Sequence, residues 1–291
     1  VSNANLEDFC RSEAAIRVVR VLMAMMMMVM MRVVMMMMIW IKLKDTVVRL
    51  AEEYVLQIQN NLITASEKNN VEKVIFLGSS CIYPKFAPQP LKEQYLLTDS
   101  LEPTNQWYAI AKITGLKACQ AIRKQYNKEY VSLMPTNLYG YFDNFDLQSS
   151  HVLPAMIRKF HEAKVNGNLP VRLWGSGTPL REFLFVDDMA DAVVFALENK
   201  LSEFLYNIGS GNDITIGQLA VIIQNIVGHN GNIIWDQTKP DGTPKKLLDV
   251  TKIKKLGWEY STELNEGIKK TYHWFQENID NLKQIKLESN T

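Results

Sequence analysis

Tyr108 and Lys112 form the pair of residues whose types and spacing point most directly to chemistry. They are four residues apart, which places both side chains on one face of a helix. A phenol with a pKa near 10 is a poor proton donor and acceptor at neutral pH, whereas a neighbouring ammonium group favours the phenolate and lowers that pKa. Of the 11 tyrosines, only Tyr108 has a lysine at this spacing, so we interpret the pair as an acid–base unit.

A short polar segment upstream supplies a group that could polarise a substrate carbonyl. Gly78, Ser79, Ser80 and Cys81 directly follow the apolar run 74–77, which is typical of a strand buried on both faces of a parallel sheet. Ligands of open α/β sheets bind at the carboxyl ends of the strands. A serine hydroxyl placed there can donate a hydrogen bond to a carbonyl that is being reduced.

The elements that must position these groups alternate between helix and strand. In chain order we expect a helix over 45–69 with Asp45 as N-cap, a strand over 74–77, a helix over 107–126 and a strand over 130–135. Residues 135–137 end the last of these strands and are expected at the same rim as Ser79. The alternation predicts an α/β fold built on a doubly wound parallel sheet.

The second half of the chain alternates less regularly. We expect strands over 182–186, 205–208 and 233–236 and helices over 187–198 (with Asp187 as N-cap), 215–227 and 262–278. These segments predict a Rossmann-like nucleotide-binding core over residues 1–150 plus about 182–212. A smaller C-terminal α/β lobe for the substrate would comprise residues 151–181 and 213–291.

Bulk properties narrow the class of function. With 47% hydrophobic residues, a chain of 291 residues can bury a sizeable core. The formal net charge of +1 gives no electrostatic reason to expect a nucleic-acid partner. Cys10, Cys81 and Cys119 are widely spaced, so we expect neither a disulfide framework nor a metal site, and we predict a reducing, cytoplasmic compartment.

Residues 21–41 form an apolar run that holds eleven of the fourteen methionines and is interrupted only by Arg32. Its length suits a membrane span, but a mid-span arginine costs about 2.5–3.5 kcal/mol on insertion scales. Three interpretations stay open: a membrane helix, a buried segment of the fold, and a stretch whose residue identities are unreliable because its complexity is so low. We favour the last and expect no membrane association.

Longer motifs point to a family. They lie at residues 76–85 (FLGSSCIYPK), 101–105 (LEPTN), 108–112 (YAIAK), 134–140 (MPTNLYG), 143–145 (DNF), 150–154 (SHVLP), 174–177 (WGSG), 181–183 (REF) and 239–244 (KPDGTP). Over about residues 57–275 the sequence resembles the bacterial GDP-L-fucose synthases, members of the extended short-chain dehydrogenase/reductase superfamily. The resemblance implies an NADP(H)-dependent enzyme that acts on a GDP-sugar, and a homodimer.

The reaction that this resemblance implies converts GDP-4-keto-6-deoxy-D-mannose to GDP-L-fucose, by epimerisation at C3 and C5 and NADPH-dependent reduction at C4. It makes Tyr108 the proton donor in the reduction, Lys112 its partner and a ribose ligand, and Ser79 the donor to the carbonyl. Cys81 and His151 would be the base and the acid of the epimerisation. A thiolate base needs a nearby cation, and a protonated imidazole would supply one. Both residues have plainer interpretations, as a small buried side chain and as a loop histidine.

The resemblance also implies two sets of binding residues. For the cofactor they are Leu77, Gly78, Ser79, Ser80, Lys112, Pro135, Asn137, Leu138 and His151. For the GDP part of the substrate they are Lys159, Trp174, Arg181 and Asp241. Trp174 could instead be a core aromatic residue and Lys159 part of a solvated helix face, and Arg158 competes with Lys159 for the phosphates.

The family pattern fails near the start of the sequence. The family begins with a strand and a glycine-rich turn that approaches the dinucleotide pyrophosphate, but no glycine precedes Gly78 here. We therefore expect the first βα unit to be missing from this sequence, either because the chain is truncated and imperfectly read or because it is a divergent member. Two alternatives to the implied reaction remain open: another nucleotide-sugar enzyme (a 4-epimerase or 4-reductase), and a non-catalytic scaffold without the glycine turn.

Overall fold

The computed structural model describes residues 46–282, with the side chains of residues 55–280 and of Leu282. The elements of the first half are α3 (Thr46–Lys68), β1 (Lys73–Leu77), the 3₁₀ turns η1 (Ser80–Ile82) and η2 (Glu93–Tyr95), α4 (Gln106–Tyr126), β2 (Glu129–Pro135) and β3 (Asn137–Tyr139). Four of these confirm the predicted order helix, strand, helix, strand, with ends that differ by at most one residue. The methionine-rich run, the predicted N-cap Asp45 and the part of the chain where the first βα unit is expected to be missing all lie outside the described residues.

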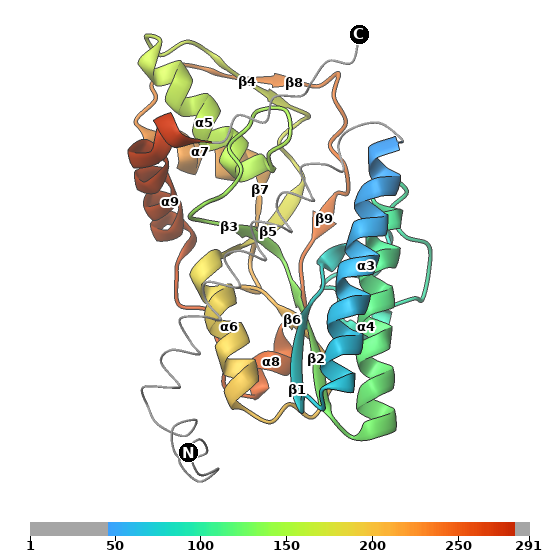
Figure 1. Cartoon of the computed structure of the whole chain (residues 1–291). Helices are drawn as coiled ribbons and strands as arrows, with labels where there is room; N and C mark the ends of the chain where they lie inside the picture. Colours follow the sequence, from blue (N-terminus) through green and yellow to red (C-terminus); the bar gives the residue numbers. More distant parts are fainter. Residues whose placement is uncertain (1–45, 283–291) are drawn as a thin grey trace, which may run out of the picture.

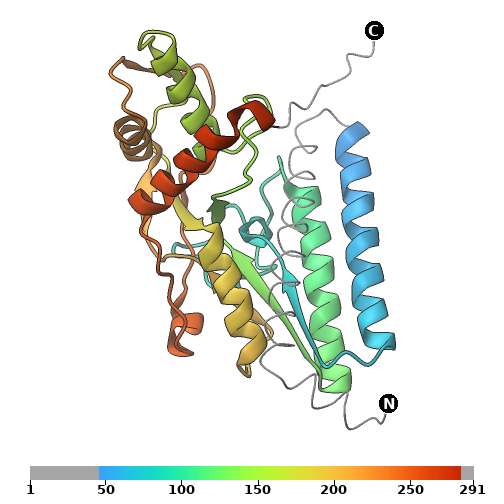
Figure 2. The same cartoon turned by 60° about the vertical axis from the view of Figure 1, so that its left-hand side comes forward.

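A three-stranded parallel sheet in the order β1-β2-β6 forms the core, with β6 at Leu205–Ile208. α3 and α4 pack side by side on one face of this sheet, and α6 (Val186–Glu198) lies on the other face (Figures 1 and 2). Helices on both faces of a parallel sheet confirm the Rossmann-like α/β fold class. Because both faces of such strands are covered, most of their side chains are apolar, which explains the continuous apolar runs in the sequence.

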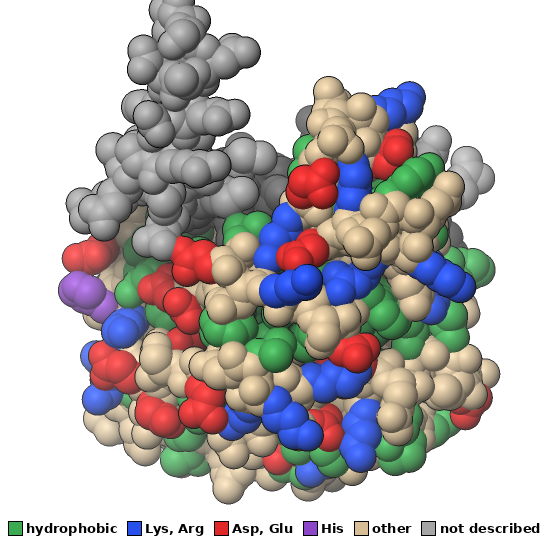
Figure 3. Space-filling model, turned by 90° about the horizontal axis from the view of Figure 1, so that it is seen from below, with side chains coloured by type: hydrophobic (Ala, Val, Ile, Leu, Met, Phe, Trp, Pro, Cys, Tyr) green, Lys and Arg blue, Asp and Glu red, His purple; other side chains and the backbone are tan. Residues whose placement is uncertain are grey.

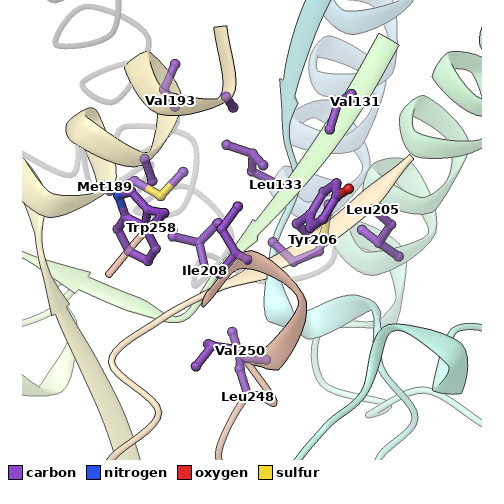
Figure 4. Packing of buried hydrophobic residues seen from close by; sticks show 14 of the residues in the cluster. Val131, Leu133, Met189, Val193, Leu205, Tyr206, Ile208, Leu248, Val250 and Trp258 are labelled. Atoms are coloured by element: carbon purple, nitrogen blue, oxygen red, sulfur yellow. The ribbon is translucent and has the colours of Figure 1, made fainter. Parts of the chain in front are cut away.

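The core of this half is an apolar cluster between β2, β6 and α6 (Figure 4). Leu133 of β2, Ile208 of β6 and Met189 of α6 are each completely buried. Burying one such side chain stabilises the fold by about 1.5–3 kcal/mol relative to leaving it in water. The rigid strand ends on which the candidate site is built therefore rest on a large packed core.

The N-cap of α6 corrects one expectation. Asp187 was predicted to cap this helix, but the N-cap is Phe185, which makes no side-chain capping bond, and Asp187 and Asp188 lie in the first turn. Acidic side chains in the first turn still favour a helix, because they face the positive end of its dipole. Asp188 is buried and accepts hydrogen bonds from the backbone N–H groups of Ser261 (2.9 Å) and Thr262 (3.2 Å), so it is used to hold another segment.

A second group of elements forms the upper part of the molecule in Figure 1. Its members are α5 (Val152–Val165), β4 (Val171–Trp174), α7 (Ile216–Val227), β8 (Ile233–Asp236), α9 (Leu264–Asn278) and the 3₁₀ turn η3 (Ile279–Asn281). β4 and β8 pair in parallel, and Phe160, Leu219, Ile223 and Phe275 are buried in a separate apolar cluster. α7 begins with a capping box of Thr215 and Gln218, close to its predicted start. α5 and β4 were not predicted.

β5 (Leu180–Phe185) joins the two parts. It pairs with β3, with β7 (Asp213–Thr215) and with the two-residue strand β9 (Lys245–Lys246). Successive side chains of a strand point to opposite faces, and here Leu184 joins the core cluster while Phe183 and Phe185 join the upper one. The short elements β3, β7, β9 and α8 (Thr251–Lys255) were not predicted, because two to five residues carry too little periodicity.

The surface of the described part shows no single sign of charge in the view from below. Lysine, arginine, aspartate and glutamate side chains are interspersed there with apolar ones (Figure 3). Among residues 46–282, none of the helices combines the length and apolar character that a bilayer crossing requires.

Candidate functional site

The carboxyl end of β1 approaches β2 closely. The N–H group of Gly78 donates to the Leu133 carbonyl at 2.9 Å, and a Cβ atom on Gly78 would collide with the side chain of Met134. The buried Ser79 then turns the chain into η1, and its Oγ accepts from the Cys81 N–H group at 3.3 Å. A side chain at this position would displace the end of the Met134 side chain, so glycine lets the strand end pack closely, and Ser79 follows directly at the rim of the sheet.

α4 brings the Tyr108–Lys112 pair to this strand end. Tyr108 is 5% exposed and Lys112 is 7% exposed. The Lys112 ammonium donates to the Leu77 carbonyl at 3.0 Å and lies 5.8 Å from the centre of the Tyr108 ring. The structure therefore places the two predicted residues together, one helical turn apart and against the end of β1.

Burial decides the protonation of this pair. It raises the pKa of the Tyr108 hydroxyl far above its usual value; the negative charge of Cys81 acts in the same direction, and Ser79 acts against it. Burial also lowers the pKa of Lys112 to about 8. The expectation that a neighbouring ammonium would lower the tyrosine pKa is therefore wrong for this arrangement, because loss of water outweighs it. No group lies where it would fully satisfy the buried Tyr108 hydroxyl, although Ser79 is near enough to favour its ionised form.

The end of β2 is tied to β5 across the same rim. The side-chain amide of Asn137 donates to the Glu182 carbonyl at 2.8 Å, and the Thr136 hydroxyl donates to that carbonyl at 3.2 Å. Pro135 closes β2, and Leu138 packs partly buried against the core cluster. The residues predicted for the nicotinamide end of a cofactor thus form two adjacent strand ends.

Cys81 opens into a small cavity, which we call the Cys81 pocket. Its volume is about 50 Å³ and its walls include Cys81, Lys85, Glu102, Asn105, Lys245 and Lys246. The thiol is free and half-buried, and its sulfur accepts from the Asn105 amide at 3.4 Å and from the Lys246 ammonium at 3.6 Å. The plainer interpretation of Cys81 as a small buried side chain is therefore wrong.

His151, the expected partner of Cys81, lies at the start of α5. It is exposed and forms the N-cap of α5. The next residue, Val152, lines a second cavity. The ammonium of Lys246, which was not predicted, is a cation in contact with the thiol.

The second cavity, which we call the Arg181 pocket, has a volume of about 150 Å³. Its walls include Val152, Trp174, Pro179, Arg181, Ile216 and Asp241. Asp241 accepts from the N–H group (2.7 Å) and from the hydroxyl (2.8 Å) of Ser176, and these bonds lower the pKa of its carboxyl. Trp174 is 65% exposed, so the interpretation of this residue as a core aromatic is wrong. Three of the four predicted GDP residues meet here.

Lys159, the fourth, is not among the residues that line the Arg181 pocket. It lies on α5, and its ammonium donates to the Arg172 carbonyl at 3.2 Å. Arg158, the competing candidate, forms an ion pair with Glu162 at 2.7 Å and donates to the Phe145 carbonyl at 3.2 Å. Both cations are thus engaged by neighbouring segments.

Three residues that the sequence did not indicate complete the site. Asn105 ends the LEPTN motif and Glu182 is the central residue of the REF motif, so motif membership was the available signal for these two, whereas Lys246 lies two residues beyond the KPDGTP motif. Glu182 is completely buried, and its carboxyl accepts from the Gly211 N–H group at 2.7 Å and the Leu248 N–H group at 2.9 Å. Burial raises the Glu182 pKa to about 7. In the described ranges, no three His, Cys, Asp or Glu side chains are grouped so that they could hold a metal ion.

Comparisons with known proteins agree with this geometry. Residues 45–209 match the model of the NAD dependent epimerase/dehydratase family. GDP-L-fucose synthase 1 of Arabidopsis thaliana is 56% identical over 226 residues, which are 78% of this chain and 70% of that protein. The GDP-L-fucose synthase of Escherichia coli K12 is 50% identical over 234 residues, 77% of this chain and 73% of that protein. A solved GDP-L-fucose synthetase from Naegleria fowleri bound to NADP is 30% identical with a TM-score of 0.74, covering 79% of this chain and 74% of that one.

Proposed function

The chain belongs to the NAD dependent epimerase/dehydratase family and, within it, to the GDP-L-fucose synthases, and on this basis we propose that it converts GDP-4-keto-6-deoxy-D-mannose to GDP-L-fucose. The reaction needs an acid–base system for epimerisation at C3 and C5 and a proton donor for reduction at C4. One observation carries the proposal: Cys81 and Tyr108 meet at a single strand end, on either side of Ser79. A simple 4-epimerase or 4-reductase has no use for the thiol.

NADP(H) fits the rim formed by β1 and β2. Gly78 packs its backbone against the Met134 side chain, and Lys112 holds a buried ammonium beside the Leu77 carbonyl. The cofactor residues in this proposal are Leu77, Gly78, Ser79, Ser80, Lys112, Pro135, Asn137, Leu138 and His151. When it is bound, NADPH supplies the hydride for C4. The Naegleria relative, described as bound to NADP, supports this choice.

Tyr108 delivers the proton of the reduction. A hydride added to the C4 carbonyl leaves an alkoxide, which needs one proton, and the raised pKa keeps the Tyr108 hydroxyl protonated until that charge develops. The Ser79 hydroxyl donates to the same oxygen and polarises the carbonyl. Lys112, at the end of β1, orients the tyrosine and binds the ribose.

Cys81 and His151 carry the epimerisation. The thiolate takes the proton from the carbon next to the ketone, the electron pair of that bond enters an enolate, and a proton returns to the opposite face of the carbon. We assign the return to His151 at the exposed N-cap of α5. Donors to the ketone oxygen, Ser79 and Tyr108, stabilise the enolate.

The GDP part binds in the Arg181 pocket. A guanidinium matches phosphate oxygens with two parallel hydrogen bonds, the exposed Trp174 indole offers a face for a base, and Asp241 supplies acceptor oxygens. Lys159 remains a proposed phosphate ligand, and would have to exchange its bond to the Arg172 carbonyl. In this assignment residues 1–150 and about 182–212 handle the cofactor, and residues 151–181 and 213–291 handle the nucleotide sugar.

The enzyme is proposed to act as a cytoplasmic homodimer. α3 and α4 present the apolar side chains Ile58 (42% exposed), Leu62 (52%), Trp107 (51%) and Ile110 (45%), and a second copy would cover them. The free thiols Cys81 and Cys119 suit a reducing compartment. Light scattering after size exclusion tests the dimer, and introducing Asp at Leu62 and Ile110 should give a monomer.

Isotope incorporation tests the reaction. With keto sugar and NADPH in D₂O, the product should carry solvent deuterium at C3 and C5. Cys81→Ser should sharply reduce that incorporation, because a serine hydroxyl is a much weaker base than a thiol. His151→Gln should impair reprotonation and change which stereoisomer accumulates. A C4-reduced product without deuterium at either carbon would make the enzyme a 4-reductase or 4-epimerase.

A further inference from the structure

The charges around the Cys81 pocket do not cancel. Besides Lys246, the titratable groups that line the pocket or act on the sulfur are Tyr83, Lys85, Glu102, Lys245 and Tyr108. Lys85 forms an ion pair with Glu102 at 2.9 Å, and Lys245 forms one with Asp213 at 3.1 Å. Among the residues that the structure describes, Lys246 has no carboxylate within ion-pair distance, and its ammonium donates to the Cys81 sulfur instead.

The backbone holds Lys246 in place. It lies opposite Arg181 in the parallel pairing of β9 with β5. The following N–H groups are also fixed: that of Leu247 donates to the Gln89 side chain at 3.0 Å, and that of Leu248 to Glu182 at 2.9 Å. These bonds fix the backbone from which the Lys246 side chain extends to the Cys81 sulfur.

Asn105 supplies a second donor to the Cys81 sulfur, from a segment separate from Lys246. It is the N-cap residue of α4, where an asparagine side chain commonly accepts from a backbone N–H group, but it makes no such bond here. Its amide group donates to the Cys81 sulfur, and its Oδ1 is buried without a hydrogen-bond partner. Two donors from separate segments converge on one sulfur, which is an arrangement that suits a thiolate.

We propose that Lys246, assisted by Asn105, is the positioning residue that holds Cys81 as the thiolate base of the epimerisation. The assignment rests on the proposed function, in which Cys81 takes a proton from the substrate. When it does so the sulfur becomes a neutral thiol, the electron pair of the C–H bond passes to the enolate, and Lys246 remains an ammonium. The cation that prepares the base is thus separate from His151, which is left to act as an acid.

The test measures the thiolate directly and needs no substrate. The rate of alkylation by iodoacetamide is followed from pH 5 to pH 10, and peptide mass analysis assigns the label to Cys81 rather than to Cys10 or Cys119. Lys246→Met should move the midpoint of this profile upward by about one pH unit, which lowers the rate at pH 7 about tenfold, because a neighbouring cation favours the thiolate. Lys246→Arg should keep the wild-type midpoint.

Lys245→Met is the matched control. It removes the same charge from the next residue and the same pocket, but that ammonium is paired with Asp213. Its midpoint should move much less than that of Lys246→Met, while circular dichroism and the thermal midpoint show that both variants are folded. Equal shifts in the two variants, or an unchanged profile in Lys246→Met, would overturn the proposal.

A second arm separates this inference from the proposed function. In D₂O, folded Lys246→Met should lose deuterium incorporation at C3 and C5, with restoration at higher pH as the thiol ionises. If the wild-type enzyme itself incorporates no deuterium, the proposed reaction is wrong whatever the alkylation profile shows. If incorporation is normal in Lys246→Met, the reaction stands and the role given to Lys246 is wrong.

Discussion

Tyr108 and Lys112 are 5% and 7% exposed, whereas Trp174 in the Arg181 pocket is 65% exposed. The first two residues share one helix and one strand end. The Arg181 pocket is assembled from residues as far apart as Val152 and Asp241. The two regions differ in burial, in sequence separation and in the number of segments that build them.

This difference matches two kinds of task. A proton donor gains from exclusion of water and from a fixed geometry, because both strengthen its interaction with developing charge. A large ligand such as a nucleoside diphosphate needs an open pocket that it can enter and leave. We therefore expect substitutions in the buried pair to lower kcat, and substitutions in the Arg181 pocket to raise KM.

The largest effect should come from Tyr108→Phe. Loss of a positioned proton donor typically lowers turnover by ~10²–10⁴-fold. Because no group fully satisfies the buried Tyr108 hydroxyl, its removal should leave the free energy of unfolding unchanged or slightly increased. Steady-state oxidation of NADPH with the keto sugar measures kcat, and urea denaturation measures stability.

Tyr130→Phe is the control for that substitution. Tyr130 is also buried and no group fully satisfies its hydroxyl, although Ser66 is near enough to favour its ionised form, and it lies on β2 with its side chain in a cluster near α4. Removal of the Tyr130 hydroxyl should leave kcat unchanged. Near-wild-type turnover in Tyr108→Phe, or an equal loss in Tyr130→Phe, would contradict the assignment of the buried pair.

The next prediction concerns Glu182, which lies between the two regions. Burial raises its pKa from the usual 4.5 to about 7. In this range the native state binds a proton more tightly than the unfolded chain does, so the stability that this group contributes is complete below pH 4.5 and is lost as the pH rises through 7. One pH unit corresponds to about 1.4 kcal/mol, so the difference between 4.5 and about 7 corresponds to a loss of roughly 3–4 kcal/mol.

Glu182→Gln should remove this part of the pH dependence. Urea denaturation of the wild type and of the variant at pH 5, 6, 7 and 8 gives the two slopes. Burial also raises the pKa of Asp143 to about 7, but Asp143 contributes equally to both proteins and cancels in the difference. Parallel slopes in the two proteins would show that Glu182 is not the buried titrating group.

The contrast between the two regions also explains what could be predicted from the sequence. Tyr108, Lys112 and Ser79 are placed by local rules: a residue after an apolar strand, and a spacing of one helical turn. Lys246 reaches Cys81 across 165 residues of sequence and lies on a strand of two residues, which no periodicity announces. Its position depends on pairing with β5, a long-range contact that local patterns do not encode.

Residues predicted by resemblance alone show the same limit. Trp174, Arg181 and Asp241 meet, although Ser176 and Asp241 are 65 residues apart, because the motifs carry information about a shared fold. Lys159 came from the same resemblance, but its ammonium is bound to the Arg172 carbonyl. The N-cap of α6 was misplaced because Asp187 suits a first turn as well as a cap.

The smallest effect should come from Arg181→Met, and it tests the open side of the comparison. The Arg181 guanidinium is partly buried, and its Nη1 donates to the Leu180 carbonyl at 2.8 Å, which leaves other N–H groups for a phosphate. A hydrogen bond to a charged group contributes about 1.5–3 kcal/mol, so KM for the GDP-sugar should rise at least about tenfold. kcat should change little, because Arg181 does not touch the reacting carbons.

Arg181→Lys separates charge from shape. If a fork of parallel N–H groups binds the diphosphate, lysine should restore only part of the affinity, because its ammonium is a point charge. If charge alone matters, lysine should restore all of it. The KM for NADPH should stay unchanged in both variants, since the proposed cofactor rim is formed by other residues. A fall in kcat equal to the rise in KM would show that the Arg181 pocket shapes the transition state as well as the complex, and the division between a buried chemical region and an open binding region would fail.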